Sequence, residues 1–273
     1  MKLTYLGTAA AEGFPAVFCN CQYCREARTL GGKNIRTRSQ ALINDDLLID
    51  LPADTYHHFL TNGIEGDKIE YLLFTHSHLD HCYVAELSMR HGAFAHDMRA
   101  PVLNAWAGRG TREKIAASGE YLGNVKLQAI APFETVSMGR YTVTALPARH
   151  KIGDEALFYI IREGEKTLLY AHDTGYFYDE VFDFISREGL VFDALSMDCT
   201  NVDIPIGNDG GHMGIPNIEA LVERLREMGA VSEKTNVVIN HFSHNAAPLH
   251  HLLEERVAPL GYLVSYDGMS IEI

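Results

Sequence analysis

The stretch Phe74-Thr75-His76-Ser77-His78-Leu79-Asp80-His81 directly follows an apolar run that predicts a short buried strand. Side chains two positions apart on an extended segment point the same way, so His76 and His78 can hold one metal ion together. Asp80 and His81 follow where the chain turns, and they are placed to face a second ion. Imidazole and carboxylate groups without thiolate suit divalent Zn, Mn, Fe or Ni. The stretch therefore predicts part of a two-metal site.

Two metal ions need further ligands, and candidates stand where other predicted strands end. His150, Asp173 and His241 each follow an apolar run, the position at which loops hold functional residues on a rigid frame. A carboxylate such as Asp173 can bridge two ions, because each of its oxygens can bind one. Taken in order with the first motif, these residues predict a dinuclear metal centre.

Apolar runs and turn signals divide the chain into two blocks of strands, each with helices. Two such blocks indicate two sheets that face each other with helices outside. We therefore expect an α+β protein, a four-layer αββα sandwich in a single domain that spans residues 1–273. The predicted strands are Lys2–Leu6, Gln40–Asn44, Leu47–Leu51, Tyr71–Phe74, Pro101–Trp106, Lys126–Ile130, Tyr141–Leu146, Ala156–Arg162, Thr167–Ala171, Phe192–Met197, Asn236–Ile239 and a last strand or hairpin at Val264–Ile273, and the predicted helices are Thr55–Leu60, Tyr178–Glu188 and Asn217–Met228.

The charge balance limits the classes of binding partner that we expect for this chain. The 273 residues carry 23 Lys+Arg against 36 Asp+Glu, a formal net charge of −13. An acidic chain is not expected to bind nucleic acid through its overall charge, because the phosphates are also negative. No apolar run approaches the ~18 residues of a membrane span, and the N-terminus lacks the apolar stretch of a secretory signal. We expect a cytoplasmic protein with no nucleic-acid or membrane partner, and the sequence leaves a homodimer open.

The cysteines indicate a second kind of metal site. An odd number of cysteines without a secretory signal does not resemble a disulfide framework. Cys19, Cys21 and Cys24 fall within six residues, and three such thiolates can share one soft metal ion. Structural zinc takes four ligands, so Cys82, Cys199 or His244 is needed as the fourth. Outside that role, Cys82 and Cys199 are expected to be buried small residues next to the site.

The order of these motifs resembles the metallo-β-lactamase superfamily of hydrolases. His-x-His-x-Asp-His is followed by a histidine, an aspartate and a histidine at strand ends, and the resemblance covers nearly the whole chain. It implies the αββα metallo-β-lactamase fold. It also implies that Asp50, at the end of Leu47-Leu-Ile-Asp50, orients the first motif from behind the ligands. By the same resemblance, one metal ion takes His76, His78 and His150, the other takes Asp80, His81 and His241, and Asp173 bridges both.

The cysteine cluster narrows the resemblance to PhnP-type phosphodiesterases. These enzymes open cyclic phosphates such as phosphoribosyl 1,2-cyclic phosphate, so the resemblance implies a small phosphate-ester substrate. A similar cluster occurs in a protein of pyrroloquinoline quinone biosynthesis, which departs from the full His-x-His-x-Asp-His set. This chain itself departs from the superfamily at His172, where a small residue usually precedes the bridging aspartate. The structural zinc would be bound by Cys19, Cys21, Cys24 and His244.

The resemblance also implies a mechanism. A hydroxide that bridges the two metal ions, which Asp80 and Asp173 help to hold, would attack phosphorus in line. His212, in Gly207-Asn-Asp-Gly-Gly-His212-Met-Gly, is the candidate general acid for the leaving alkoxide. The glycines beside it would let backbone amides approach a phosphate. The alternatives are a hydrolase of the same fold that acts on a thioester, lactone or β-lactam, and a non-hydrolytic accessory protein of cofactor biosynthesis.

Two further groups of basic residues are predicted at the surface. One is a local run of cations, which is either a solvated face or a patch that draws in an anionic substrate. The other consists of two histidine pairs on predicted helices. The first group is Arg25, Arg28, Lys33, Arg36 and Arg38, and the second is His57-His58 and His250-His251.

Overall fold

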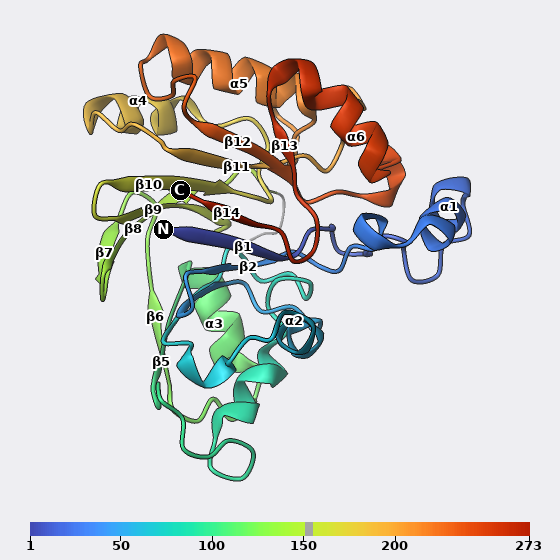
Figure 1. Ribbon diagram of the computed structural model, residues 1–273. Coiled ribbons are helices and arrows are strands. Elements are labelled where there is room, and N and C mark those ends of the chain that lie inside the picture. Colours follow the sequence, from blue (N-terminus) through green and yellow to red (C-terminus); the bar gives the residue numbers. More distant parts are fainter. Residues whose placement is uncertain (151–154) are drawn as a thin grey trace.

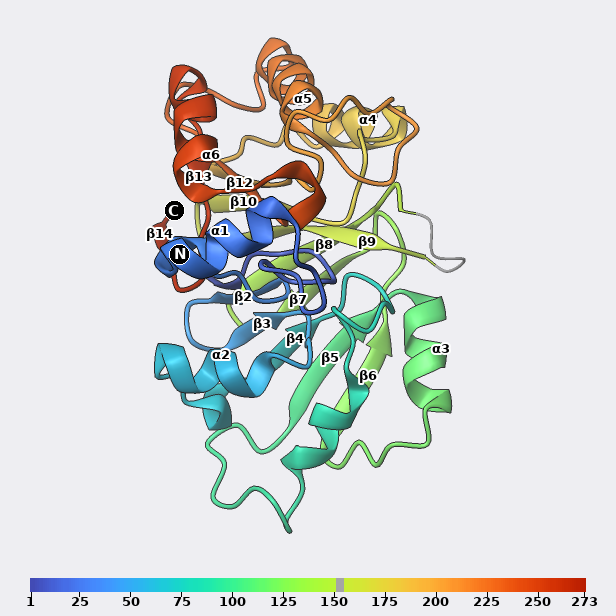
Figure 2. The same cartoon turned by 90° about the vertical axis from the view of Figure 1, so that its right-hand side faces the viewer.

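Two seven-stranded sheets lie face to face in the middle of the molecule, and helices cover both outer faces (Figures 1 and 2). The structure is a computed structural model that describes residues 1–150 and 155–273. The four-layer αββα sandwich expected from the sequence is confirmed.

The first sheet has the strand order β14-β1-β2-β3-β4-β5-β6. It is antiparallel from β14 to β3 and parallel from β3 to β6. Helices α2 (Thr55–Asn62) and α3 (Arg109–Ala117) lie on its outer side, together with the 3₁₀ helix η3 (Val84–Arg90). Its strands are β1 (Lys2–Gly7), β2 (Gln40–Ile43), β3 (Leu47–Ile49), β4 (Tyr71–Leu73), β5 (Leu103–Ala107), β6 (Val125–Ala129) and β14 (Ser270–Glu272).

The second sheet has the order β13-β12-β11-β10-β9-β8-β7, and α4 (Asp179–Arg187), α5 (Ile215–Glu227) and α6 (His250–Val257) cover it (Figure 1). It is antiparallel from β7 to β10 and parallel from β10 to β13. No helix in the described part of the chain is both long enough and apolar enough to cross a membrane. The strands are β7 (Thr135–Met138), β8 (Tyr141–Pro147), β9 (Leu157–Glu163), β10 (Lys166–Ala171), β11 (Ala194–Asp198), β12 (Asn236–Asn240) and β13 (Leu263–Val264).

The strand of the opening motif shows why its sequence is apolar throughout. On β4, Tyr71 and Leu73 pack into the core between the two sheets, whereas Leu72 packs into the layer between the first sheet and its helices. Successive side chains of a strand point to opposite faces. Because both faces of this sheet are covered, the strand is a continuous apolar run instead of an alternating one.

The prediction for the last element is wrong in one respect. Strands β13 and β14 belong to different sheets, so Val264–Ile273 is not a hairpin. The chain crosses between the sheets there, and Tyr5 N donates a 2.8 Å hydrogen bond to Met269 O. Strands of two and three residues carry too little pattern to identify their partners. Helices α1 (Gln22–Leu30) and α3 and strand β7 were not predicted, and they are largely polar or half exposed.

Three residues predicted at the surface are buried: Arg36, His58 and His250 are 2%, 1% and 4% exposed. Arg36 Nη1 donates to Thr8 Oγ1 at 2.9 Å and to Ser265 O at 2.6 Å. Those polar partners, distant in the sequence, allow a guanidinium to be buried. The prediction that this arginine lies on a solvated or substrate-attracting face is therefore wrong.

Candidate metal centre

Five of the predicted site residues follow the carboxyl ends of strands. Strands β3 and β4 run parallel, as do β10, β11 and β12. Strand β8 is antiparallel to β9, which is antiparallel to β10, so β8 and β10 also point the same way. The loops after these strands meet at one edge of the sandwich. The residues are Asp50 after β3, His76 after β4, His150 after β8, Asp173 after β10 and His241 after β12.

Three of these residues have an uncommon backbone conformation. The φ angles of Asp50, Asp173 and His241 are 63°, 51° and 64°. This is the left-handed region, which residues other than glycine adopt rarely, although Asp and His do so more often than most. Such strained positions cluster at functional sites. Here they fall on one predicted supporting residue and two predicted metal ligands.

The first predicted metal triad is brought together. His78 Nδ1 lies 2.9 Å from His76 Nε2 and 3.2 Å from His150 Nε2. The three residues form one of the clusters that could hold a metal ion. Burial lowers the pKa of His76 well below its usual value and also lowers that of His150. Both imidazoles are therefore held in the neutral form that metal binding requires.

The second predicted triad, Asp80, His81 and His241, is also brought together. Asp173 Oδ2 lies 3.0 Å from His81 Nε2 and 2.9 Å from His241 Nε2, and Asp80 Oδ2 lies 3.2 Å from His81 Nε2. The other oxygen of Asp173, Oδ1, is 3.9 Å from His150 Nε2 in the first triad. The two oxygens of Asp173 thus face the two triads, which is the position that a bridging ligand needs.

Hydrogen bonds behind three of the histidines turn one nitrogen of each of these rings toward the centre. His81 Nδ1 donates to Asp50 Oδ2 at 2.7 Å, and His150 Nδ1 donates to Gly211 O at 3.2 Å. His241 Nδ1 lies 2.8 Å from Thr200 Oγ1, which itself donates to His241 O. A proton on Nδ1 leaves Nε2 with a free lone pair. This is the usual arrangement behind metal-binding histidines.

Unmatched buried atoms show that the donor set fits a cation. His81 Nε2, Asp173 Oδ2 and His241 Nε2 are buried and have no hydrogen-bond partner, although both ring nitrogens lie within 3.0 Å of Asp173 Oδ2. Leaving a buried polar atom unmatched is costly, and native structures do so rarely. A divalent cation at the point that these atoms surround would satisfy all three.

The carboxylates around the second triad give that part of the site a negative potential. Burial would lower the pKa of His81, but the charges of Asp173, Asp50 and Asp80 outweigh it and hold that pKa well above its usual value. Burial would raise the pKa of Asp173, but His241 and His81 hold it well below its usual value. Without a cation the cluster therefore retains a proton on His81, which metal binding would release.

His212, the predicted general acid, lies beside both triads. Its ring centre is 4.9 Å from that of His150 and 5.7 Å from that of His241. Its Nδ1 lies 3.0 Å from Asp198 Oδ2. Burial would lower the pKa of His212, but the charge of Asp198 and the hydrogen bond to it raise that pKa to about 9. His212 is therefore an imidazolium at neutral pH in the absence of metal.

Asp198 is a site residue whose role the sequence reasoning missed. It is fully buried at the end of β11, and its carboxylate accepts hydrogen bonds from the backbone N–H groups of Asp173, Thr200 and Met213 at 3.0–3.1 Å. It also binds His212, so one carboxylate connects the predicted bridging ligand to the predicted acid. Its place at a strand end, in Asp198-Cys199-Thr200, was the available signal.

The glycine loop approaches the site closely. A Cβ at Gly175 would lie 1.8 Å from Gly210 O, and one at Gly211 would lie 3.6 Å from His150 Nδ1. The first contact shows that the loop over residues 207–211 can pack against the chain after Asp173 only because position 175 has no side chain. The glycines thus let backbone, including Gly211 O, reach the ring of His150.

Cys19, Cys21, Cys24 and His244 form a separate cluster. His244 Nδ1 lies 3.9 Å from Cys21 Sγ and 3.7 Å from Cys24 Sγ. Tetrahedral zinc with the usual Zn–S and Zn–N bond lengths has ligands about 3.5–3.8 Å apart. The hydrogen bond with His244 lowers the pKa of the Cys21 thiol to about 6. The cluster therefore fits a zinc ion, and His244 is the residue that completes it.

The remaining cysteines and His172 are packing residues. Cys82 and Cys199 are buried, as expected, and burial raises the pKa of the Cys199 thiol far above its usual value. His172 is fully buried against the Tyr170 ring, and its Nε2 lies 2.8 Å from Ser196 Oγ. The departure from a small residue at this position is thus accommodated by a polar partner on the neighbouring strand.

The fold and the site define a class: an αββα protein whose sheet edge carries a histidine and aspartate centre suited to divalent metal ions. Residues 48–242 match the family model of the β-lactamase superfamily domain, and the chain belongs to that superfamily. Coenzyme PQQ synthesis protein B of Acinetobacter baylyi is 25% identical over 318 residues, which cover all of both chains.

Two solved structures share this fold over nearly their whole length. Zn(2+)-bound PqqB from Methylobacterium extorquens has a TM-score of 0.75 at 19% identity, and the match covers 100% of both chains. A diphosphatase from the PhnP family has a TM-score of 0.73 at 22% identity, over 100% of this chain and 97% of that one. The predicted resemblance to this superfamily is confirmed by the family model, and the side-chain clusters of this chain could hold metal ions.

Proposed function

We propose that this protein is a metal-dependent phosphodiesterase that hydrolyses a small cyclic phosphate or phosphodiester. The observation that carries the proposal is the placement of His212, held by Asp198, beside two clusters that could each hold a divalent ion. Phosphoryl transfer to water needs electrophilic stabilisation of the phosphate oxygens and a proton for the leaving alkoxide. The proposed metal sites and His212 would supply these two requirements separately.

The protein side chains have distinct roles in this proposal. Asp173 and the two triads would hold two divalent ions, of Mn, Zn, Fe or Ni, which when bound act as Lewis acids and lower the pKa of a water molecule. Asp50 would keep His81 oriented through the 2.7 Å hydrogen bond to Nδ1. Asp198 would keep the backbone of Asp173 in place through its 3.0 Å bond to the amide.

His212 would act as the general acid. Because its Nδ1–H points to Asp198 Oδ2, the opposite nitrogen, Nε2, is the one available to a substrate. A pKa of about 9 in the metal-free protein means that the ring carries its proton at pH 7. Two nearby dications would lower that pKa toward neutrality, which brings it closer to the value that an efficient general acid needs.

The surroundings favour a small substrate. The chain has a net charge of −13, which repels a long polyanion, while bound cations would make the site locally positive. The loop at residues 207–211 contains glycines that let backbone come close to the site, as it does at His150. These features favour a compact phosphate ester over RNA or DNA.

The test is a substrate panel on purified protein loaded with Mn²⁺ or Zn²⁺. Bis-p-nitrophenyl phosphate and 2′,3′-cyclic nucleotides represent phosphodiesters, and a thioester, a lactone and a β-lactam represent the alternative acyl substrates. Phosphodiester turnover that disappears in His78→Ala supports the proposal. Turnover of acyl substrates alone would overturn it in favour of a hydrolase of the same fold with a different substrate.

A second candidate function comes from the curated relatives, which are PQQ synthesis proteins B from Acinetobacter baylyi and Klebsiella pneumoniae, at 25% and 24% identity over the whole chain. They favour a role in making that coenzyme. This role is tested by expressing the protein in a bacterium that lacks PQQ synthesis protein B. Restored coenzyme production would support the second function, and failure together with phosphodiester turnover would support the first.

A further inference from the structure

Two cysteines of the candidate zinc cluster also form a pair at the start of a helix. Cys21 caps the N-terminus of α1, and its Sγ accepts a 3.5 Å hydrogen bond from the backbone N–H of Cys24. The ligand atoms of Cys19, Cys21, Cys24 and His244 all lie within 4.8 Å of one another. Cys21 and Cys24 are thus a Cys-x-x-Cys pair at a helix N-terminus, a position at which cysteine thiolates are reactive.

The two cysteines of this pair differ in exposure. Cys21 is partly exposed, whereas Cys24 is 0% exposed and belongs to an apolar cluster with Phe14 and Leu249. A small oxidant in solution would therefore reach Cys21 first, while Cys24 waits in the interior with its sulfur within 4.8 Å. An accessible cysteine next to a second one that can attack it is the arrangement that converts a first oxidation into a disulfide.

The charged groups at the cluster suit a reactive thiolate. Arg28 Nη2 donates to Cys19 O at 2.9 Å, which holds a guanidinium at the cysteine loop. A carboxylate, Glu12, lies 3.9 Å from His244 Nε2, on the side of the ring opposite to Nδ1, the nitrogen that faces the sulfurs of Cys21 and Cys24. A bound zinc ion would keep the sulfurs as thiolates, which is the form that reacts with an oxidant.

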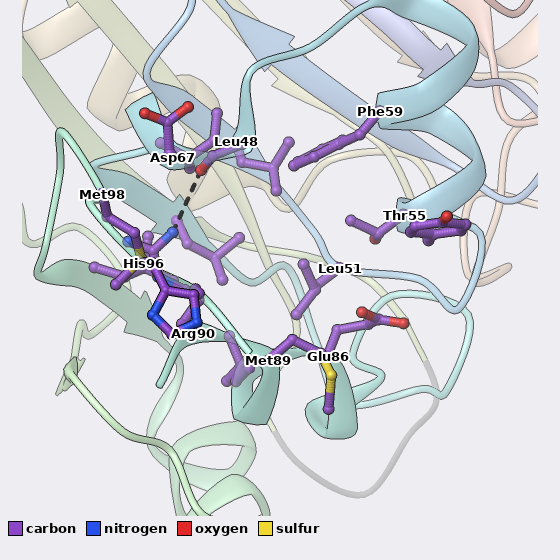
Figure 3. Close-up of a pocket in the computed structure, with 17 residues that line it drawn as sticks. Leu48, Leu51, Thr55, Phe59, Asp67, Glu86, Met89, Arg90, His96 and Met98 are labelled. Atoms are coloured by element: carbon purple, nitrogen blue, oxygen red, sulfur yellow. Dashed lines mark hydrogen bonds between the residues drawn. The ribbon is translucent and has the colours of Figure 1, made fainter. Parts of the chain in front are cut away.

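The remaining cysteines are shielded from an oxidant. Cys82 and Cys199 are 4% and 0% exposed. Neither is among the described residues that line the cavity of about 270 Å³ between α2 and η3 (Figure 3). Met89 and Met98 do line that cavity, but oxidation of a thioether adds oxygen and does not join two residues. Disulfide formation should therefore be confined to the cysteine cluster.

We propose that Cys21 and Cys24 form a reversible disulfide when the protein meets hydrogen peroxide, with release of the zinc ion. Cys21 Sγ attacks one peroxide oxygen, so that an S–O bond forms, the O–O bond breaks and the hydroxide that leaves takes up a proton to become water. Cys24 Sγ then attacks Cys21 Sγ, the S–S bond replaces the S–O bond, and a second hydroxide leaves as water. The two sulfurs together lose two electrons, which the peroxide gains.

The disulfide would dismantle the zinc site. Only Cys19 and His244 would remain as ligands, and structural zinc takes four. The two sulfurs, at most 4.8 Å apart, need to approach to about 2.0 Å. Since His244 is three residues from His241, release of zinc would also free the loop that presents this candidate ligand of the dinuclear centre. The inference goes beyond the proposed function and does not depend on the reaction at that centre.

The test treats the full-length, zinc-loaded protein with hydrogen peroxide, because Zn²⁺ itself has no redox chemistry. We expect one disulfide per chain, the loss of at least one zinc ion per chain by element-specific mass spectrometry, and recovery of both thiols with dithiothreitol. Trypsin should release residues 3–25, which contain the three clustered cysteines and no methionine. The peptide should lack two hydrogens after oxidation and regain them on reduction.

Two matched variants identify the pair. Cys19→Ser removes a zinc ligand but keeps the pair, so it should still form the disulfide. Cys24→Ser removes the buried partner, so Cys21 should stop at the sulfenic acid, which dimedone traps. A disulfide in Cys24→Ser but not in Cys19→Ser would overturn the assignment, even if one variant folds poorly, because the wild-type protein gives its own result. Wild-type thiols and zinc that survive peroxide unchanged, or oxygen added to Cys21 without a disulfide, would also overturn the proposal.

Discussion

His241 and His244 are three residues apart, yet their rings belong to two different clusters. His241 Nε2 lies 2.9 Å from Asp173 Oδ2 in the candidate dinuclear centre, whereas His244 Nδ1 lies 3.7 Å from Cys24 Sγ in the cysteine cluster. Between them, Ser243 Oγ donates to Glu12 Oε1 at 2.6 Å. The loop that presents His241 is thus held at its far end by the predicted zinc site.

This link predicts that Cys21→Ser lowers the metal content of the dinuclear centre as well as the stability. The serine hydroxyl is a poor zinc ligand, so the hold on His244 would be lost and the loop that carries His241 would loosen. Element-specific mass spectrometry should find fewer than two divalent ions per chain in the centre, after the structural zinc is counted separately. Full occupancy of the centre in a variant that has lost its zinc would contradict the link.

A matched variant keeps the ligand function at the same position. Cys21→His would leave two cysteines and two histidines, a set that structural zinc commonly accepts. We expect this variant to retain its zinc and to recover most of the metal in the dinuclear centre. Equal losses in Cys21→Ser and Cys21→His would show that the effect comes from the packing of Cys21 and not from the zinc.

The role proposed for His212 predicts a dependence on the leaving group. His212→Ala should lower kcat on a 2′,3′-cyclic nucleotide by about 10²–10⁴-fold, the usual contribution of a general acid, because an alkoxide leaves poorly without a proton. Bis-p-nitrophenyl phosphate should be affected much less, since p-nitrophenolate is stable without one. Asp198→Asn should shift activity in the same direction. Equal losses on both substrates with both metals retained would argue against proton donation by His212.

Asp50→Asn should weaken metal binding by about 10–100-fold, as changes behind metal-binding histidines usually do. Asp50 Oδ2 accepts the hydrogen bond from His81 Nδ1–H at 2.7 Å, and Oδ1 accepts one from the Thr75 amide at 2.7 Å. An amide can keep one of these bonds, but its NH₂ group would favour a proton on Nε2 of His81, where the metal binds. Competition with a coloured chelator measures the affinity.

The control is Asp54→Asn, which neutralises a nearby carboxylate outside the centre. Asp54 forms a 3.0 Å salt bridge with Arg38 and has no contact with the metal clusters among the described residues. Its substitution should leave metal affinity within about twofold of the wild type. An Asp50→Asn variant that binds metal as tightly as this control would remove the orienting role of Asp50.

The local part of the site could be predicted from the sequence, and the part made by distant contacts could not. Strand ends and the spacing of His76, His78 and Asp80 are local properties, and the structure places His76 and His78 in the first triad and Asp80 in the second, as expected. Asp198 differs because its importance lies in bonds to residues 14 and 25 positions away. Arg36 looked like a surface cation because nothing in its own stretch shows that Thr8 and Ser265 surround it.

The burial of His250 predicts a loss of stability in mild acid. Its Nδ1 lies 3.1 Å from Arg36 Nη2, which can only donate, so Nδ1 must accept and the ring must be neutral. Burial and the charge of Arg36 lower the pKa of His250 to about 4, below the usual value near 6.5. In the unfolded chain His250 gains a proton below about pH 6.5, whereas in the folded protein it gains one only near pH 4. Its contribution is therefore complete above pH 6.5 and is lost as the pH falls toward 4, by about 2 kcal/mol at pH 5.

Urea unfolding of wild-type and His250→Gln protein at pH 7.5 and 5.0 isolates this contribution, because glutamine can accept the bond from Arg36 but does not titrate. The variant should lose about 2 kcal/mol less than the wild type between these pH values, and equal losses would show that His250 is not the titrating group.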